Sequence, residues 1–379
     1  MATVDNIFVK TMKLIKKVFF SQTVLCIAIL AMLVSCIFVP IDSEYAGYFN
    51  FQTLATLFCT LAVVGAFSDI HLFEIISKSI IIKLKNLRYA VITLVFITFF
   101  GSMILANDMA LLTFLPLGFF VLDRTDNYDS MAFTFIMQNI AANLGGMLTP
   151  FGNPQNLYLF AFYEIDNIEF MQIMFPTFAA ATVMIIIICL FVKKTPLELK
   201  RDDNYKFNVK RTVIYSCLFV FSILIVFRVV NPFVGTFVVV AALMFLDRKA
   251  LKIVNYPLLL TFCCFFVFSS NLARIQAVND FFQEVLPLNT LLFGILSCQC
   301  ISNVPSAVLL SHFTNDYRAL LQAVNIGGCG TLIASLASLI TFTEFKKHNP
   351  GKVGNYLAKF TAFNLLFIVV LYFVATAFM

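Results

Sequence analysis

Long apolar segments follow one another along the whole chain, with only short polar connections between them. A run of roughly 20 apolar residues is long enough to cross a bilayer as a helix. The longest plainly polar run extends only from Lys193 to Arg211, which leaves no room for a separate water-soluble domain. The pattern predicts an all-α polytopic membrane protein. Its apolar segments are 19–39, 50–67, 87–122, 129–165, 170–192, 211–230, 232–247, 256–270, 286–313, 317–345 and 354–378.

The composition points to the same class. Hydrophobic residues make up 61% of the 379 residues and charged residues 12%, with a mean hydropathy of +0.93. This balance is far from that of a soluble domain. The net charge of +6 does not indicate a nucleic-acid partner, because the basic residues lie beside apolar spans, as membrane topology requires. Cys298 and Cys300 lack His or carboxylate neighbours at metal-ligand spacing, so no zinc site is expected.

The N-terminal region carries basic residues before its first apolar run, which is also typical of a signal peptide. Residues 33–36 resemble a lipoprotein cleavage site. We expect a retained first helix over 19–39 instead, because this run is long enough to span and precedes a polytopic chain.

Two of the apolar segments share a motif at their centres. Residues 143–156 read NLGGMLTPFGNPQN and residues 325–338 read NIGGCGTLIASLAS, so Asn, Gly, Gly and Thr recur at the same spacing. Glycine, proline and small amides interrupt a helix, and the backbone groups freed inside a membrane can hold an ion or a small anion. Segments 129–165 and 317–345 are therefore predicted to be broken helices, as in transporters.

Two other segments carry polar residues where a simple spanning helix would be apolar. Segment 87–122 has Asn107 and Asp108 at its centre, and segment 286–313 has Ser302 and Asn303. We predict that both are re-entrant helical hairpins. If the N-terminus is cytoplasmic and both hairpins return to the side from which they enter, then Lys and Arg concentrate in the cytoplasm. All but three of the 26 then lie inside, the exceptions being Arg228, Arg274 and Arg318.

This topology divides the chain into two inverted-topology repeats, with the C-terminus outside. Residues 1–192 form the first repeat, residues 193–230 a cytoplasmic loop and linker helix, and residues 231–379 the second repeat. Each repeat crosses four times, so the extra crossing 211–230 inverts the second copy. The stretches 70–85 and 271–284 could lie in the interface plane as connecting arms. Ordinary loops are the alternative for both.

Asp108 is the only charged residue between Arg88 and Asp123. A carboxylate inside a membrane costs about 3 kcal/mol on insertion scales, so it marks a functional site by default. It could ligate Na⁺ directly or carry a proton; the alternative is a wet cytoplasmic turn that only caps a half-helix. Because Val304 stands at the equivalent place of the second hairpin, we expect the charge-coupled step in the first half.

The candidate binding residues are the polar side chains and glycines of these four motifs. No Arg or Lys is placed to clamp an anion, so helix N-termini, amides and hydroxyls must bind it. We predict ion- or substrate-binding roles for Asn107, Asp108, Gly145, Gly146, Thr149, Gly152, Asn153, Pro154 and Asn156 in the first half, and for Ser302, Asn303, Gly327, Gly328, Thr331, Ser335 and Ser338 in the second. Na⁺ ligands are expected among Asn107, Asp108 and Asn153, and among Asn303 and Ser335.

The four motifs together resemble the ion transporter superfamily, which includes arsenite permeases, citrate-transporter-like permeases, divalent anion:Na⁺ symporters and an Na⁺/H⁺ antiporter branch. The resembling sequences are NDMAL at 107–111 followed by Pro116, TPFGNPQN at 149–156, SNVP at 302–305 and GGCGT at 327–331. The resemblance implies a scaffold domain that usually dimerises, a transport domain that moves as an elevator, and cation sites at the hairpin tips and broken-helix loops.

The chain departs from the pattern of this superfamily at three places. The symporter branch usually has Ser-Asn-Thr at both tips, where this chain has Ala-Asn-Asp and Ser-Asn-Val. Arsenite-permease-like members tend to have Asp where this chain has Ser302. Gln155 stands where a second proline is common.

These observations predict a secondary active transporter that moves a small anion, a carboxylate or an inorganic oxyanion, across a bacterial-type cytoplasmic (inner) membrane. It would be coupled to Na⁺ or H⁺, work by alternating access as a homodimer, and need no further cofactor. The alternatives are an Na⁺/H⁺ antiporter that uses Asp108 and an arsenite-type efflux permease. An intramembrane enzyme is disfavoured, because Asp108 has no acidic partner and no nucleophile–base pair is evident.

Overall fold

The computed structural model describes residues 23–72, 75, 84, 86–123, 125–197, 207–226, 229–254 and 256–379. Helices account for all regular structure in these ranges, which contain no strand. The α-helices are α2 (Thr23–Phe38), α3 (Phe51–Asp69), α5 (Leu87–Ile104), α6 (Asn107–Asp123), α7 (Met131–Gly145), α8 (Pro154–Phe162), α9 (Asn167–Leu190), α10 (Val209–Val226), α11 (Pro232–Leu246), α12 (Arg248–Ile253), α13 (Tyr256–Arg274), α14 (Gln276–Val285), α15 (Thr290–Ile301), α16 (Asn303–Leu310), α17 (Tyr317–Ile326), α18 (Leu336–His348) and α19 (Val353–Phe378). Five 3₁₀ turns are η1 (Ser43–Tyr48), η2 (Tyr128–Ser130), η3 (Gly146–Leu148), η4 (Leu286–Leu288) and η5 (Pro350–Lys352).

The helices expose apolar side chains and bury many polar ones, which is the reverse of a soluble protein. Phe245 is 90% exposed and Ile37 is 78% exposed, whereas Asn139 and Asn156 are completely buried. Large exposed apolar surfaces mark contact with a membrane or a partner. The all-helical, multi-pass membrane class predicted from the sequence is confirmed.

Several helices are long and apolar enough to cross a membrane. Among the described residues, Leu87–Ile104, Asn167–Leu190 and Pro350–Phe378 meet this criterion by length and composition. A fourth is added if Leu259–Arg274 and Gln276–Leu288, which are bent by 88° from each other, count as one span. Shorter apolar helices lie within three further expected spans, at Ala28–Phe38, Phe51–Phe67 and Pro232–Leu246, and in the expected second hairpin, at Thr290–Ile301. Leu87–Ile104 meets this criterion although we expected it to be one arm of a hairpin. Length and composition alone do not distinguish a spanning helix from a hairpin arm, because they do not include the direction of the chain after the helix.

At both polar tips the chain doubles back as a pair of packed helices. α5 ends at Ile104 and α6 begins at Asn107, and Gly101 of α5 lies against the ring of Phe114 of α6. α15 and α16 are separated by Ser302 alone, which has a positive φ of 76°. The hydroxyls of Ser297 and Ser306 on these two helices lie 2.8 Å apart.

Both duplicated motifs interrupt their helices. The first lies between α7 and α8, where η3 and an irregular stretch occupy 146–153. The second lies between α17 and α18, where 327–335 is not α-helical. Stretch 271–284 contains the sharp bend between α13 and α14, while most of stretch 70–85 lies outside the described residues.

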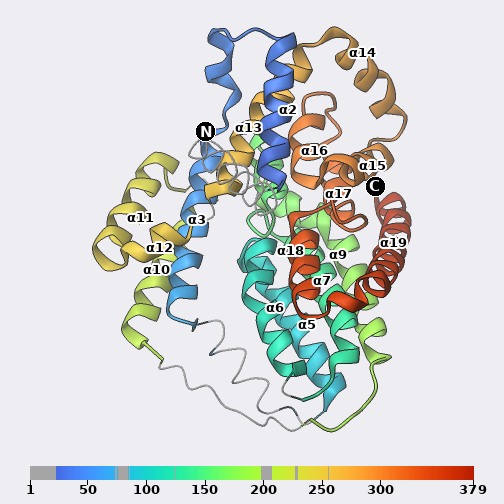
Figure 1. Ribbon diagram of the computed structural model, residues 1–379. Helices are drawn as coiled ribbons and strands as arrows, with labels where there is room; N and C mark the ends of the chain where they lie inside the picture. The colour runs from blue at the N-terminus through green and yellow to red at the C-terminus, as the bar shows by residue number, and fades with distance from the viewer. Residues whose placement is uncertain are drawn as a thin grey trace, which may run out of the picture.

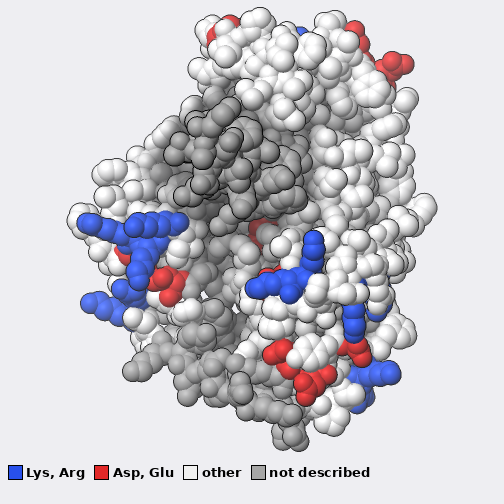
Figure 2. All heavy atoms as spheres, viewed as in Figure 1, with Lys and Arg blue, Asp and Glu red and all other residues white. Residues whose placement is uncertain are grey.

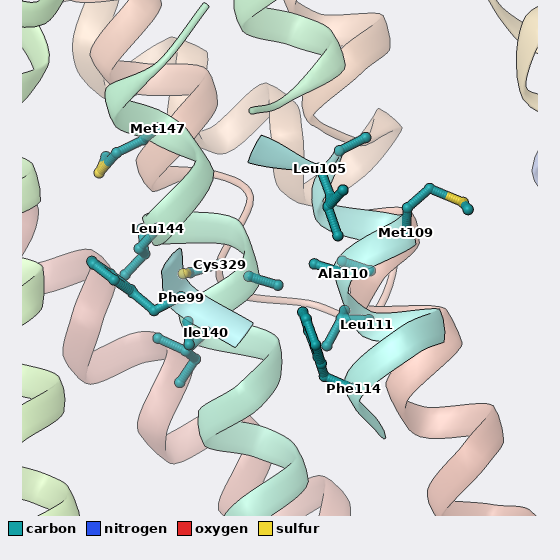
Figure 3. Close-up of a cluster of buried hydrophobic side chains, with 14 of the residues drawn as sticks. Phe99, Leu105, Met109, Ala110, Leu111, Phe114, Ile140, Leu144, Met147 and Cys329 are labelled. Atoms are coloured by element: carbon teal, nitrogen blue, oxygen red, sulfur yellow. The ribbon is translucent and has the colours of Figure 1, made fainter. Parts of the chain in front are cut away.

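Two groups of helices pack closely among themselves, and Figure 1 shows them on opposite sides of the molecule. α10, α11 and α12 pack against α3, while α5, α6, α7, α9, α18 and α19 pack around one another. Figure 3 shows the apolar core of the second group, with Ile140 and Leu144 of α7 beside Phe99 of α5, and with Leu111 and Phe114 of α6 facing them. This core supports the hairpin and broken helix of the first half.

The charged residues are unevenly distributed over the surface. Figure 2 shows Lys and Arg mainly over the left flank and the lower half of the view, and few at the upper end. Two arginines form close ion pairs with carboxylates: Arg274 with Asp42 at 2.6 Å and Arg318 with Glu169 at 2.6 Å. These two arginines are among the three that the predicted topology places outside.

The close approach at Gly145 gives a test of the packing. Replacing Gly145 by Ala should lower the thermal unfolding midpoint of the purified protein in detergent, because a methyl group there would meet the Phe99 carbonyl and, at 2.6 Å, the Ser102 hydroxyl. Overpacking of this kind costs about 1–3 kcal/mol. Gly354→Ala is the matched control, since nothing lies within 4 Å of an added Cβ at that residue of α19. Equal midpoints for the two variants would contradict the close packing.

Candidate functional site

The tip of the first hairpin is attached to the break of the first broken helix by two hydrogen bonds. The backbone N–H of Asn107 donates to the carbonyl of Gly152 at 3.2 Å. The hydroxyl of Thr149 donates to the carbonyl of Met103 at 2.8 Å. Both bonds use a backbone group that is left unpaired at a helix end. They fix the position of the hairpin tip relative to the break.

The second half repeats these two contacts with its own residues. The backbone N–H of Asn303 donates to the carbonyl of Ala334 at 2.9 Å, and the hydroxyl of Thr331 donates to the carbonyl of Gln299 at 3.1 Å. In each half the accepting residue of the break stands three positions after the threonine. The two threonines therefore connect hairpin to break, and the hydroxyl proton of each is used in that connection.

The glycines of the motifs lie where other segments approach too closely for a side chain. An added Cβ at Gly146 would be 2.5 Å from the side-chain oxygen of Asn153, and Gly152 faces the carbonyl of Gly146. At Gly327 the nearest atoms include the Cβ and Sγ of Cys298, both at 2.8 Å. At Gly328 the nearest is the amide nitrogen of Asn303, at 3.0 Å. These glycines allow the backbone to approach closely.

The two broken helices cross, and amide side chains bind one half to the other. Asn325 donates to the side-chain oxygen of Asn156 at 2.6 Å and accepts from the amide of Asn153 at 3.0 Å. In the opposite direction, Asn143 donates to Ser335 at 3.2 Å. Asn139, one helical turn before Asn143 on α7, donates to Ser338 at 3.3 Å.

Three of these residues were missed as site residues by the sequence analysis. Asn143 and Asn325 are the first residues of the duplicated motifs, but we did not predict a binding role for them. Asn139 lies outside both motifs. A usable signal was present, because Asn139 and Asn143 are four residues apart and share one helix face. Their partners on the other half could not be read from the sequence.

Amide groups also bind the carbonyls that each break releases. In the first half, the amide of Asn156 donates to the carbonyls of Gly146, Met147 and Thr149 at 3.2–3.3 Å. In the second half Gln299 has this role, and it donates to the carbonyls of Gly327 and Cys329 at 3.0 and 3.1 Å. Gln299 was not predicted, although it is the single amide of α15. Its function depends on how the hairpin lies over the break.

A small cavity lies where the two hairpin tips meet. Its volume is about 30 Å³, enough for a water molecule or a monatomic ion. The wall consists of the first residues of four helices together with part of α13. These residues are Asn107 and Asp108 of α6, Pro154 and Gln155 of α8, Ser302 with Asn303, Val304 and Pro305 at the start of α16, Leu336 of α18, and Thr261, Phe262 and Phe265 of α13.

Asp108 is the only charged side chain on this wall, and it is 4% exposed. Among the described residues, neither a hydrogen bond nor an ion pair reaches its carboxylate. The side-chain oxygen of Gln155 is also completely buried without a hydrogen-bond partner. The wall thus carries one carboxylate and several neutral polar residues, an arrangement suited to a hard cation or a proton.

The predicted Na⁺ ligands divide between this wall and the network behind it. Asn107, Asp108 and Asn303 line the cavity, whereas Asn153 and Ser335 do not. Asn153 is directed to the crossing, where its amide binds the carbonyl of Asn143 as well as Asn325. Ser335 caps α18 and lies 2.9 Å from the hydroxyl of Ser338.

A polytopic helical protein whose interrupted helices meet at a small cavity lined by both polar and apolar residues has the architecture of a membrane transporter. The family described as citrate transporter, CitMHS, matches residues 12–316, and the chain belongs to this family. The uncharacterized transporter MJ0456 of Methanocaldococcus jannaschii is 34% identical over 313 residues, which are 81% of this chain and 84% of that protein.

Two further relatives differ in how much of the chain they cover. The inner membrane protein YbiR of Escherichia coli is 27% identical over 311 residues, 80% of this chain and 82% of its own length. The Na⁺/H⁺ antiporter NhaD of Vibrio cholerae is 28% identical over 182 residues, 48% of this chain and 36% of its own. The resemblance to the ion transporter superfamily is thereby confirmed: the protein is a transporter of this group, and two of these three relatives are named as a transporter and an antiporter.

The crossing of the two halves predicts a large effect of Asn325→Ala. This change removes one hydrogen bond of the Asn153 amide and leaves the buried oxygen of Asn156 without a partner, which costs about 1–3 kcal/mol. The thermal unfolding midpoint should fall well below that of the control Asn355→Ala, in which the asparagine is exposed on α19. The double variant with Asn153→Ala should lose less than the two single losses added together. Strict additivity would contradict a direct cross-half contact.

Proposed function

We propose that this transporter is a secondary active transporter that moves a small anion, a carboxylate or an inorganic oxyanion, and couples it to Na⁺ or H⁺ by alternating access. The observation that carries the proposal is the meeting of four helix N-termini, those of α6, α8, α16 and α18, at one cavity. Each N-terminus carries a partial positive charge, which favours an anion. No Lys or Arg belongs to the wall.

Asp108 supplies a physical reason for coupling. Its carboxylate lies on the same wall as the four N-termini, so a second negative charge would be repelled there. A cation or a proton that neutralises Asp108 removes this repulsion and lets the N-termini bind the anion. The site thus favours anion and cation together, and disfavours the anion alone.

The small volume of the cavity requires a change of shape during transport. A space of about 30 Å³ holds an ion but not a tricarboxylate, whose pockets measure hundreds of Å³. We infer that the hairpin tips separate from each other, or from Phe262 and Phe265 of α13, to admit the substrate. Movement of a transport domain against a scaffold, as an elevator within a homodimer, is our proposal for this step.

We propose further that the chain forms two inverted repeats with re-entrant hairpins, in the cytoplasmic membrane. The matched contacts at Thr149 and Thr331, and at Asn107 and Asn303, support two units built alike. The concentration of Lys and Arg supports a cytoplasmic N-terminus.

A second candidate function is Na⁺/H⁺ antiport with Asp108 as the shared carboxylate. Two observations favour it: the carboxylate has no partner among the described residues, and one relative is named an Na⁺/H⁺ antiporter. In this case cation and proton would compete for Asp108, and no anion would be needed. An arsenite-type efflux permease is a further alternative, which arsenite flux would reveal.

Transport in proteoliposomes tests the main proposal. We expect that at least one of citrate, succinate, sulfate and phosphate accumulates when an inward Na⁺ or H⁺ gradient is imposed, and not without it. Asp108→Asn should reduce gradient-driven accumulation by about tenfold or more, the effect of losing roughly 1.4 kcal/mol of cation binding. Asp280→Asn on α14 is the matched control, because Asp280 is exposed and distant from the cavity wall.

The same vesicles distinguish the two candidates. If the main proposal is right, a pH-sensitive dye inside them should not respond to added Na⁺ alone, because anion symport does not exchange Na⁺ for protons. A response to Na⁺ alone that disappears in Asp108→Asn would instead establish antiport and contradict anion symport.

Topology can be tested independently of the substrate. Alkaline phosphatase fused after Met379 should be active, because this enzyme folds outside the cytoplasm, and green fluorescent protein at the same position should be dark. Fusions within residues 198–206, which the proposed topology places in the cytoplasm, should show the opposite. A fluorescent C-terminal fusion would contradict the proposed orientation.

A further inference from the structure

A second hollow, which we call the basic hollow, lies at the junction of α3, α10, α11 and α12. Its volume is about 480 Å³, and its wall consists of residues 244–249, Arg211 of α10 and Asp69 of α3. It shares no wall residue with the small cavity at the hairpin tips. Figure 1 places α11 and α12 on the left, and Figure 2 shows Lys and Arg gathered on that flank. The proposed transport function gives this hollow no role.

The charged residues of the basic hollow leave an excess of one positive charge. Its wall has three basic and two acidic residues, namely Arg211, Arg248, Lys249, Asp69 and Asp247. The three basic side chains are exposed, whereas Asp247 is buried. Neutral donors already bind the Asp247 carboxylate, which accepts from the hydroxyl of Tyr215 at 2.9 Å and from the backbone N–H of Lys249 at 3.1 Å. The balance of charge suits a ligand that carries one negative charge.

The basic side chains of the hollow also retain unused donors. Arg211 lies 4.0 Å from the Asp247 carboxylate, which is too far for a hydrogen bond. Arg248 donates through Nε to the carbonyl of Met244 at 3.0 Å, and its terminal nitrogens point elsewhere. Within the part of the chain that the structure describes, no carboxylate forms an ion pair with Arg248 or Lys249. Guanidinium and ammonium groups with unused donors bind phosphate oxygens well.

An apolar surface continues from the basic hollow along α11. Phe245 is 90% exposed, and Met244 and Leu246 beside it are exposed as well. Phe233 and Phe237, nearer the start of the same helix, are also exposed. In the proposed topology α11 ends at the cytoplasmic surface, so the basic residues that follow it lie at the depth of the lipid head groups. An apolar face that leads into a cluster of cations matches the acyl chains and the head group of a lipid.

We propose that the basic hollow binds one anionic phospholipid of the cytoplasmic leaflet, with its phosphodiester between Arg211, Arg248 and Lys249 and its acyl chains along α11. A phosphodiester carries one negative charge, which equals the excess charge of the wall. A soluble phosphate would use the same cations but would leave the apolar face of α11 uncovered. The bound lipid stabilises the packing of α10, α11 and α12 against α3.

Native mass spectrometry of the purified full-length protein with added lipid tests this inference. We expect one phosphatidylglycerol retained per chain, and much less phosphatidylcholine, because the head group of phosphatidylcholine has no net charge. Arg248→Gln combined with Lys249→Gln should weaken the binding of phosphatidylglycerol by about tenfold or more, since each basic residue near the membrane surface adds to the attraction for anionic lipid. Lys346→Gln combined with Lys347→Gln is the matched control. Both lysines are exposed on α18, outside the hollow and on the same side in the proposed topology, and their replacement should leave the affinity unchanged.

Four outcomes would overturn the inference. These are equal retention of the two lipids, equal loss of affinity in the two double variants, binding of glycerol 3-phosphate as tight as that of phosphatidylglycerol, and dimers that retain no phosphatidylglycerol because a second copy covers α11. If the Arg248 and Lys249 double variant is not monodisperse, the unchanged protein decides the question. Its affinity for phosphatidylglycerol should fall as the salt concentration rises from about 0.1 M to about 1 M, and an affinity independent of salt would contradict recognition by charge. Gradient-driven anion flux in vesicles is a separate measurement and tests only the transport proposal.

Discussion

Backbone groups released by the two helix breaks have no water to bind within an apolar bundle, and the rest of the structure depends on how they find partners. Asn156 supplies donors to the carbonyls of the first break and Gln299 to those of the second. The hairpin tips then donate further bonds to the breaks through the N–H groups of Asn107 and Asn303. Because each hairpin completes the hydrogen bonding of its break, hairpin and broken helix cannot be placed independently.

The same backbone arrangement carries different chemistry in its two halves. The threonine contacts and the tip contacts match in kind, but the first half has Asp108 at the cavity where the second has Val304. In the first half, the amide that binds the released carbonyls belongs to Asn156, which follows the break. In the second half it belongs to Gln299, which lies on the hairpin. A repeated scaffold therefore does not imply a repeated ion site, since the partners of the oxygens decide where a charge is stabilised.

Much of the fold follows from patterns that are local in the chain. The apolar segments, the Gly-Gly pairs and the polar tips identify helices, interruptions and turns to within a few residues, because these depend on short-range sterics and on the absence of water. The candidate site was identified in part. Asn107, Asp108, Pro154, Ser302 and Asn303 do line one cavity. Gln155, Gln299, Asn139 and Asn325 were not recognised; for the last three the reason is that their partners lie on other segments of the chain.

The sequence by itself determined the membrane class, the two motifs and the single buried charge between Arg88 and Asp123. Composition and local sterics suffice for these, because each reflects a property of a short segment in an apolar solvent. Only the tertiary structure decided which oxygens are hydrogen-bonded and which face the cavity. That depends on the distance between segments nearly two hundred residues apart, such as Asn153 and Asn325, which lie within 3.0 Å of each other through their side chains. A hydrogen bond exists only at such short range, so no pattern along the chain reveals it.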